Sequence, residues 1–100
     1  MDIQHDEAKK KFRVEVDGYT AYVAYDIHDG GLDIRHTIVP EEIGGRGIAS
    51  ALVKTAYDYA ACHGLKPIAT CSYAVTWLKR HPEYEGDISS DYGGDGTCAL

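Results

Sequence analysis

The sequence predicts one mixed α/β domain of the α+β kind, in which an antiparallel meander of three strands precedes a single parallel βαβ unit. Residues 12–16, 19–25 and 32–39 alternate apolar residues with polar or β-branched ones, as half-buried strands do. Two turn signals rich in aspartate and glycine, at 17–18 and 29–31, separate these segments. An amphipathic helix, a short strand and a second helix follow. The expected order of elements is therefore β-β-β-α-β-α.

The first two strands are expected to form a hairpin. Residues 1–11 are rich in charge and are expected to be a polar leader that precedes the domain. Residues 12–16 and 19–25 contain β-branched and aromatic side chains, and a two-residue turn joins them. Such a short connection allows only antiparallel neighbours. The third strand continues the sheet and stops at Pro40, which lacks a backbone donor.

A glycine-rich stretch follows the third strand and opens the main helix. Beyond Gly47 the apolar residues recur at helical spacing, which gives the helix one buried face. This face comprises Ile48, Leu52, Ala56, Tyr59 and Ala60. The pair His63-Gly64 supplies a plausible C-terminal cap, because glycine accepts the left-handed conformation found there.

A shorter strand and a shorter helix are expected in the second half of the chain. The strand covers 66–71, with Pro67 near its start, where strands tolerate proline, and it runs parallel to the third strand. The helix covers 73–81 and is stopped by Pro82. The domain is then expected to span 12–85, followed by a Gly-, Asp- and Ser-rich tail over 86–100 that packs loosely.

Composition argues against several classes of function. The chain has 100 residues, which suit one domain, and a net charge of −6 with no basic run longer than the three lysines at 9–11. Nucleic acids and anionic membranes are therefore not expected as partners. No segment has the length and hydropathy of a membrane span, and the polar beginning does not resemble a signal peptide. A cytoplasmic location is expected.

The cysteines suggest neither a disulfide framework nor a metal site. Cys62, Cys71 and Cys98 are odd in number and lack both the C-x-x-C spacing and a Cys/His pattern typical of metal ligands. We expect them to be thiols in a reducing compartment, with no bound metal.

The glycine-rich stretch is suited to bind phosphate. A helix start carries unpaired backbone N–H groups and the positive end of the helix dipole, and glycine lets an anion come close to the backbone. Two common nucleotide motifs do not fit. The dinucleotide fingerprint has Ser50 at its third glycine position, and the P-loop would need a Gly-Lys-Ser/Thr sequence that is missing here.

The stretch resembles the pyrophosphate loop of the GCN5-related N-acetyltransferases. The family pattern Gln/Arg-x-x-Gly-x-Gly/Ala falls on residues 44–49, with Gly44 at the position of the Gln or Arg. Two further patterns are similar to those of short, YjdJ-like family members. They are Arg35-His36-Thr37-Ile38-Val39-Pro40, and Cys71-Ser72-Tyr73-Ala74 followed by Trp77-Leu78 and His81-Pro82-Glu83-Tyr84. The resemblance covers about 12–84 and implies a truncated form of the family fold.

The resemblance implies that the cofactor is acetyl-CoA (coenzyme A) and that the acetyl group is transferred to an amine. The backbone of Ile38 and Val39 would bind the pantetheine amides in the manner of an added strand. The residues that would surround the pyrophosphate are Gly44, Gly45, Arg46, Gly47, Ile48, Ala49 and Ser50. The acceptor amine, whether a small molecule or a protein, stays unidentified.

The general acid of larger family members has no counterpart here. Their asparagine position is Cys71, and the tyrosine that protonates the leaving thiolate is replaced by Leu78. His36 and Cys71 are the candidate catalytic residues. Strand alternation places His36 on the face of Leu32, Ile34 and Ile38. Cys71 precedes a helix N-terminus, a setting that favours the thiolate.

Two chemical roles are open for this pair. His36 could be the general base for the incoming amine, or it could activate Cys71 to carry the acetyl group in a two-step transfer. The alternative is purely structural, because histidines on apolar strand faces and buried cysteines are common in protein cores.

Two other functions remain alternatives at this point. A non-catalytic module that binds or senses acyl-CoA is suggested by Leu78 at the tyrosine position. A small interaction domain with an incidental glycine loop would show no affinity for coenzyme A. The sequence does not decide between a monomer and a dimer.

Overall fold

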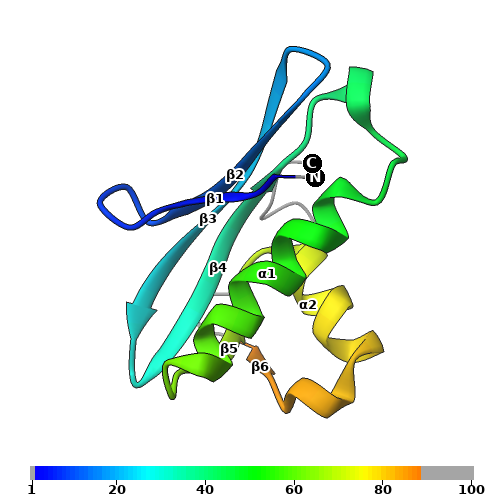
Figure 1. Cartoon of the computed structure of the whole chain (residues 1–100). Helices are drawn as coiled ribbons and strands as arrows, with labels where there is room; N and C mark the ends of the chain where they lie inside the picture. Colours follow the sequence, from blue (N-terminus) through cyan, green and yellow to red (C-terminus); the bar gives the residue numbers. More distant parts are fainter. Residues whose placement is uncertain (1, 89–100) are drawn as a thin grey trace.

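The computed structural model describes residues 2–88, which form one mixed sheet with two helices on the same face (Figure 1). The strands follow one another across the sheet in the order β1-β2-β3-β4-β5-β6. They are β1 (Gln4–Asp6), β2 (Lys11–Val16), β3 (Tyr19–His28), β4 (Gly31–Ile38), β5 (Lys66–Ala69) and β6 (Asp87–Ile88). The helices are α1 (Ile48–Cys62) and α2 (Ser72–Arg80), with short 3-10 turns η1 (Glu41–Ile43) and η2 (Pro82–Tyr84).

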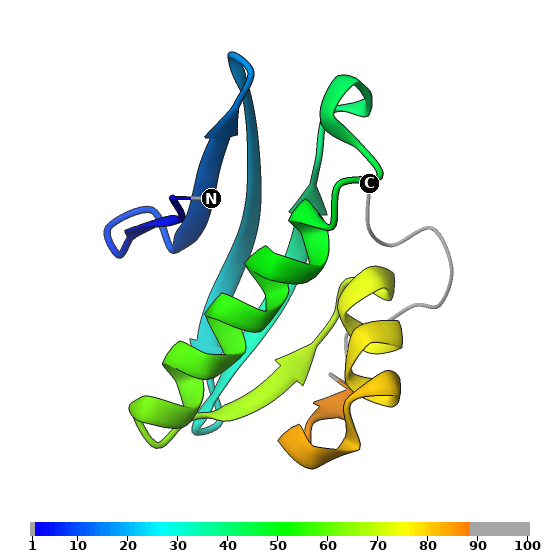
Figure 2. The same cartoon turned by 45° about the vertical axis from the view of Figure 1, so that its right-hand side comes forward.

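The strand directions confirm the predicted mixed topology. Strands β1 to β4 pair antiparallel, whereas β4 with β5 and β5 with β6 pair parallel. Each parallel pair is joined through a helix and the chain moves across the sheet in one direction. Right-handed crossovers then place both helices on the same face, and α1 and α2 lie side by side there (Figure 2).

The core lies between the sheet and the two helices. Helix α1 buries Leu52, Val53, Ala56 and Tyr57 completely, close to the helix face that was predicted. Its ends also agree with the prediction. Gly47 caps the start with φ 74°, and the left-handed residue after the helix is a glycine, at 64. Two glycines that can be recognised in the sequence therefore mark the two ends of α1.

The N-terminal segment belongs to the sheet, although it was expected to be a polar leader. Its strand β1 pairs with the start of β2. His5 stacks on Phe12 and forms a hydrogen bond with the hydroxyl of Tyr25, and its ring also contacts Tyr59 of α1. Burial is the main reason why the pKa of Tyr25 is raised, to about 12. The histidine thus anchors a strand that has no hydrophobic pattern of its own.

A β-bulge divides β4 into two halves. Tyr25 of β3 pairs with Ile34, and the residue before it, Ala24, pairs with His36. Arg35 is therefore an extra residue in β4 relative to β3. Because side chains alternate along a strand, this insertion reverses which residues face the core. Beyond the bulge Thr37 is fully buried and His36 is exposed.

The end of the described chain adds one more strand. Residues Asp87–Ile88 pair with β5, inside the region expected to be a loose tail. The rest of that tail, including Cys98, lies outside the described residues. Within residues 2–88 no helix has the length and hydropathy needed to span a membrane.

Candidate functional site

The glycine-rich loop lies between the end of β4 and the start of α1. The turn η1 closes its first half, and Gly45 and Gly47 then adopt positive φ angles of 76° and 74°. An L-residue with a side chain would be strained at either position. A pocket of about 300 Å³ opens here. It is lined by Val39, Gly44, Gly45, Gly47, Ile48, Ala49 and Tyr73.

This pocket brings together most of the residues predicted to bind the cofactor. It joins the end of β4, at Val39, to the loop glycines and to the first turn of α1. The first backbone N–H groups of a helix have no partner within the helix, and the dipole adds positive potential at the same point. An anion placed in this pocket would therefore meet the positive end of the α1 dipole, next to the end of β4.

Arg46 is the one charged side chain of residues 44–50, and it does not point freely into solvent. Its guanidinium forms an ion pair of 2.6 Å with Asp17, in the turn between β2 and β3. Both side chains are about half exposed, so the pair adds little to stability. Its effect is to connect the glycine loop to the β2–β3 turn.

Strands β4 and β5 separate at a point that we call the fork, defined by Ile34, Thr70 and Cys71. The parallel pairing runs from Gly31 to Ile34 and then ends. At the fork the carbonyl oxygen of Ile34 accepts hydrogen bonds of 3.0 Å from the N–H groups of both Thr70 and Cys71. Strand β4 continues to Ile38, while the chain after β5 turns into α2. The two segments diverge on the side that leads to the glycine loop.

Cys71 lies at the fork and is completely buried. It is the residue before α2, with extended backbone angles, as predicted. Its Sγ lies 3.3 Å from Oγ1 of Thr37, across the fork on β4. The sulfur is disulfide-bonded, so the prediction that Cys71 is a reduced thiol is wrong for this structure, whereas Cys62 is a free and exposed cysteine as expected.

The structure does not bring His36 and Cys71 together on one face. The prediction that His36 shares the face of Leu32 and Ile34 is wrong, because the bulge at Arg35 reverses the alternation. Thr37 takes the inward position and contacts Cys71 instead. His36 lies on the opposite, exposed face of the sheet. Nothing in the sequence marked Thr37, because a bulge has no clear local signal.

Helix α2 is fixed against the first turn of α1. The indole Nε1 of Trp77 donates to Oγ of Ser50 at 3.0 Å, and the ring of His81 stacks on Trp77 at 3.9 Å. A second pocket of about 180 Å³ lies beside this contact. Its lining includes Arg80 and His81, which places these two residues next to the glycine loop region. Leu78, at the position of the family tyrosine, is buried.

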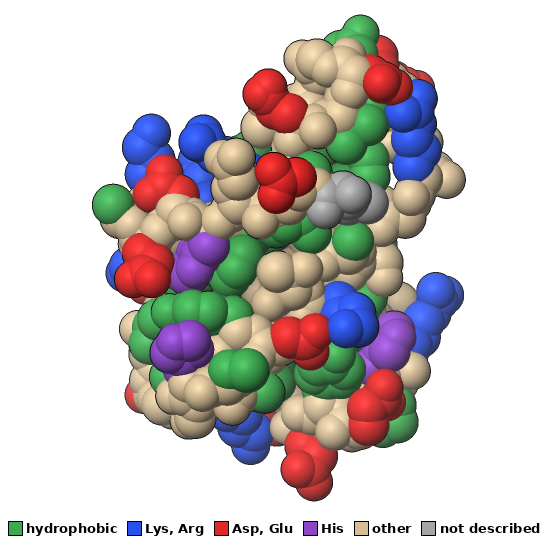
Figure 3. Space-filling model, in the orientation of Figure 1, with side chains coloured by type: hydrophobic (Ala, Val, Ile, Leu, Met, Phe, Trp, Pro, Cys, Tyr) green, Lys and Arg blue, Asp and Glu red, His purple; other side chains and the backbone are tan. Residues whose placement is uncertain are grey.

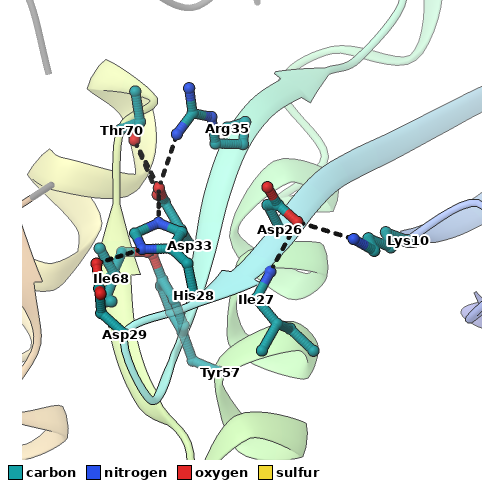
Figure 4. A network of polar contacts seen from close by, with 10 residues as sticks. All are labelled: Lys10, Asp26, Ile27, His28, Asp29, Asp33, Arg35, Tyr57, Ile68 and Thr70. Carbon is teal, nitrogen blue, oxygen red and sulfur yellow. Dashed lines mark hydrogen bonds and ion pairs between the residues drawn. The ribbon is translucent and has the colours of Figure 1, made fainter. Parts of the chain in front are cut away.

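A buried polar network on β3, β4 and β5 was not predicted (Figure 4). Asp33 is fully buried, and both of its oxygens lie 2.9 Å from the hydroxyl of Thr70, which donates to the carboxylate. The same carboxylate contacts His28 Nε2 at 2.8 Å and Arg35 at 3.1 Å. In the sequence these residues are isolated polar positions in β3 and β4 and directly after β5, and they form no recognisable motif. The pairing of the strands decides that those residues meet.

We expect the imidazole of His28 to titrate above its ordinary pKa of 6.5. Its hydrogen bond to Asp33, and then that to Asp29, favours the protonated ring and raises the pKa. The resulting stability is fully present below pH 6.5 and is lost as the pH rises through the folded-state pKa. NMR titration of the ring protons measures the midpoint. Asp33→Asn should lower it more than Asp29→Asn does, and an unshifted midpoint in the wild type would contradict the assignment.

Charges on the surface are mixed. On the face drawn in Figure 3, acidic and basic side chains are interspersed, with no broad basic area among the described residues. Within residues 2–88 no three His, Cys, Asp or Glu side chains are grouped so that they could hold a metal ion.

Fold and site together define a small α+β domain with a glycine-rich loop and pocket at the start of α1, beside a forked pair of parallel strands. A family profile described as GCN5-related N-acetyl-transferase matches residues 11–88, most of the chain. The chain therefore belongs to the GCN5-related N-acetyltransferase family.

Relatives and a solved structure agree with this assignment. Protein NATD1 of Xenopus tropicalis is 34% identical over 83 residues, which cover 80% of this chain and 76% of the relative. Human NATD1 is also 34% identical over 83 residues, covering 80% and 74%. The solution structure of a GCN5-like N-acetyltransferase candidate from Staphylococcus aureus superposes with a TM-score of 0.69. It shares 28% identity, and the match covers 95% of this chain and 94% of the other.

Proposed function

We propose that this protein is an acetyl-CoA-dependent N-acetyltransferase that acts on an amine. The observation that carries the proposal is the pocket in which Val39, at the end of β4, meets the glycine loop and the start of α1. A ligand with a diphosphate next to an extended, amide-containing arm matches this arrangement. Coenzyme A has both parts.

The binding mode follows from the two halves of this pocket. The diphosphate would lie against the backbone N–H groups from Gly45 to Ser50, where glycines permit close approach. The amides of the pantetheine arm would pair with backbone groups of Ile38 and Val39 and lead back toward the fork. Membership of the family supports this mode.

The acetyl end would then lie at the fork, close to Thr37 and Cys71. Helices α1 and α2 occupy one face of the sheet, so the amine would approach from the other face, which carries His36. In a direct transfer the amine nitrogen bonds to the acetyl carbon, the carbon–sulfur bond breaks, and the thiolate leaves with the electron pair. His36 would accept the proton that the nitrogen loses.

A two-step route through Cys71 is the competing mechanism. Its sulfur would first take the acetyl group from the thioester and then pass it to the amine. This route requires a reduced thiol at Cys71, so it has to be tested in the presence of a reductant. The separation of His36 and Cys71 onto different faces favours direct transfer, with Cys71 as part of the lining of the acetyl site.

Native mass spectrometry with acetyl-CoA, under reducing conditions, tests the proposal. We expect a one-to-one complex of the protein with the cofactor. Peptide mapping of the same sample then separates the two routes, since an acetyl group on Cys71 would support the two-step transfer. Absence of a complex, while a known acetyltransferase forms one in parallel, would contradict the proposed cofactor.

Replacing His36 with alanine is expected to lower turnover by about 10²- to 10⁴-fold, the usual contribution of a general base. Acetyl-CoA affinity should change by less than about twofold, because the side chain lies on the face away from the helices. Thiol release with a panel of primary amines and lysine peptides measures turnover. His63→Ala, which removes an exposed histidine at the end of α1, is the matched control. Equal turnover in the two variants would exclude His36 as the base.

A non-catalytic acyl-CoA-binding module is the second candidate. The observation that favours it is Leu78, which is buried at the position of the family's proton-donating tyrosine and cannot donate a proton. Tight binding of acetyl-CoA without turnover of any amine in the panel would support this candidate over the enzyme.

A further inference from the structure

We infer that Asp33 and Thr70 form a clamp across the fork that positions the acetyl end of the cofactor. The pair is called the fork clamp below. The inference rests on the proposed function and adds to it two residues that none of the three sequence patterns contains. It concerns positioning, because Asp33 would act on the acetyl end of the cofactor only through Thr70.

The contact between the two side chains is short and shielded from water. The hydroxyl of Thr70 lies 2.9 Å from each oxygen of Asp33. Asp33 is fully buried and Thr70 is 7% exposed. A hydrogen bond to a charged acceptor in such surroundings is stronger than one between neutral groups, and its loss leaves a buried charge with one partner fewer.

The clamp lies directly beside the backbone hydrogen bonds of the fork. Asp33 precedes Ile34, whose carbonyl oxygen accepts from the N–H groups of Thr70 and Cys71 at 3.0 Å. Side chains and backbone thus fix the same two residues from adjacent points on β4. Cys71 begins the turn into α2, so the clamp determines where β5 ends and the divergence of the two segments begins.

Charge on the clamp is balanced from the neighbouring strand β3 and from β4 itself. His28 of β3 and Arg35 of β4 both contact the carboxylate of Asp33. A buried carboxylate is costly unless it is paired in this way. Arg35 is also the bulge residue, so the group that compensates the clamp belongs to the irregularity that turns Thr37 toward Cys71. The bulge, the fork and the clamp form one connected unit.

Two ligands of different reach test the inference with the full-length protein. Acetyl-CoA extends from the glycine loop to the fork, whereas adenosine 3′,5′-bisphosphate carries phosphates but no pantetheine arm. In Thr70→Val, which keeps the side-chain shape but removes the hydroxyl, we expect acetyl-CoA to bind about tenfold more weakly. The affinity for the bisphosphate should stay within about twofold of the wild type. Thr70→Ser restores the hydroxyl and should recover acetyl-CoA affinity.

Calorimetry measures both affinities, and NMR spectra establish that each variant is folded. If Thr70→Val does not fold, Asp33→Asn takes its place, with the same expectation. Equal weakening of both ligands would overturn the inference in favour of a general structural role. Unchanged acetyl-CoA affinity in a folded variant would overturn it as well. Failure of the wild type to bind acetyl-CoA would instead overturn the proposed function, and the inference with it.

Discussion

Replacing Gly47 with alanine is expected to weaken acetyl-CoA binding by about tenfold or more, which corresponds to ~1.4 kcal/mol. Gly47 has φ 74° and starts α1, and a Cβ there would have no protein atom within 4 Å. The methyl group would therefore occupy the space through which a phosphate approaches the backbone. Isothermal titration with acetyl-CoA measures the change.

Gly64→Ala provides the matched control at the other end of α1. Gly64 has φ 68°, and a Cβ added to it also meets nothing within 4 Å. Both variants place an L-residue in the left-handed region and should lose about 1 kcal/mol of stability. Only the Gly47 variant should lose affinity. If the two variants bind acetyl-CoA equally well, the glycine loop does not hold the cofactor.

Replacing Leu52 with alanine is expected to lower the free energy of unfolding by about 2–5 kcal/mol. The side chain is completely buried in the core between α1 and the sheet, so its removal leaves a cavity that neighbouring atoms fill only in part. Urea denaturation followed by circular dichroism, without cofactor, measures the loss. In a domain of this size such a loss is a large fraction of the total stability.

Ile27→Ala serves as the comparison for this variant. Ile27 is 44% exposed on β3, so its truncation should cost about 0.5–1 kcal/mol. Similar losses at the two positions would mean that α1 does not pack on the sheet as described.

The helices and the glycine loop could be predicted because their signals are local. Apolar residues at helical spacing gave the buried face of α1, and Gly47 and Gly64 marked its two ends. The same holds for the hairpin between β2 and β3, whose turn residues stand next to each other in the sequence. The parallel pairing of β4 and β5 followed from the handedness of crossovers.

The face of the sheet on which His36 lies could not be predicted, because it depends on one extra residue in β4. Regular alternation assigns His36 to the core, and the bulge at Arg35 exchanges it for Thr37. A bulge is stabilised by the pairing of the whole strand with its neighbour, and no single residue type announces it.

Contacts between distant segments explain the remaining differences. Asp33 and Thr70 are 37 residues apart, and only the pairing of β4 with β5 makes them neighbours. Likewise, β1 is held by the packing of His5 on Phe12 and not by a hydrophobic pattern of its own. Signals of this kind become visible only when the sheet is assembled.

The ion pair between Arg46 and Asp17 has a consequence for the proposed cofactor complex. Arg46 and Asp17 are 29 residues apart in the sequence. A phosphate bound at the glycine loop would compete with the carboxylate of Asp17 for the guanidinium of Arg46. Occupancy of the loop and the position of the β2–β3 turn are then linked, and each shifts the other by the same free energy. In that complex the β2–β3 turn would report ligand binding without touching the ligand.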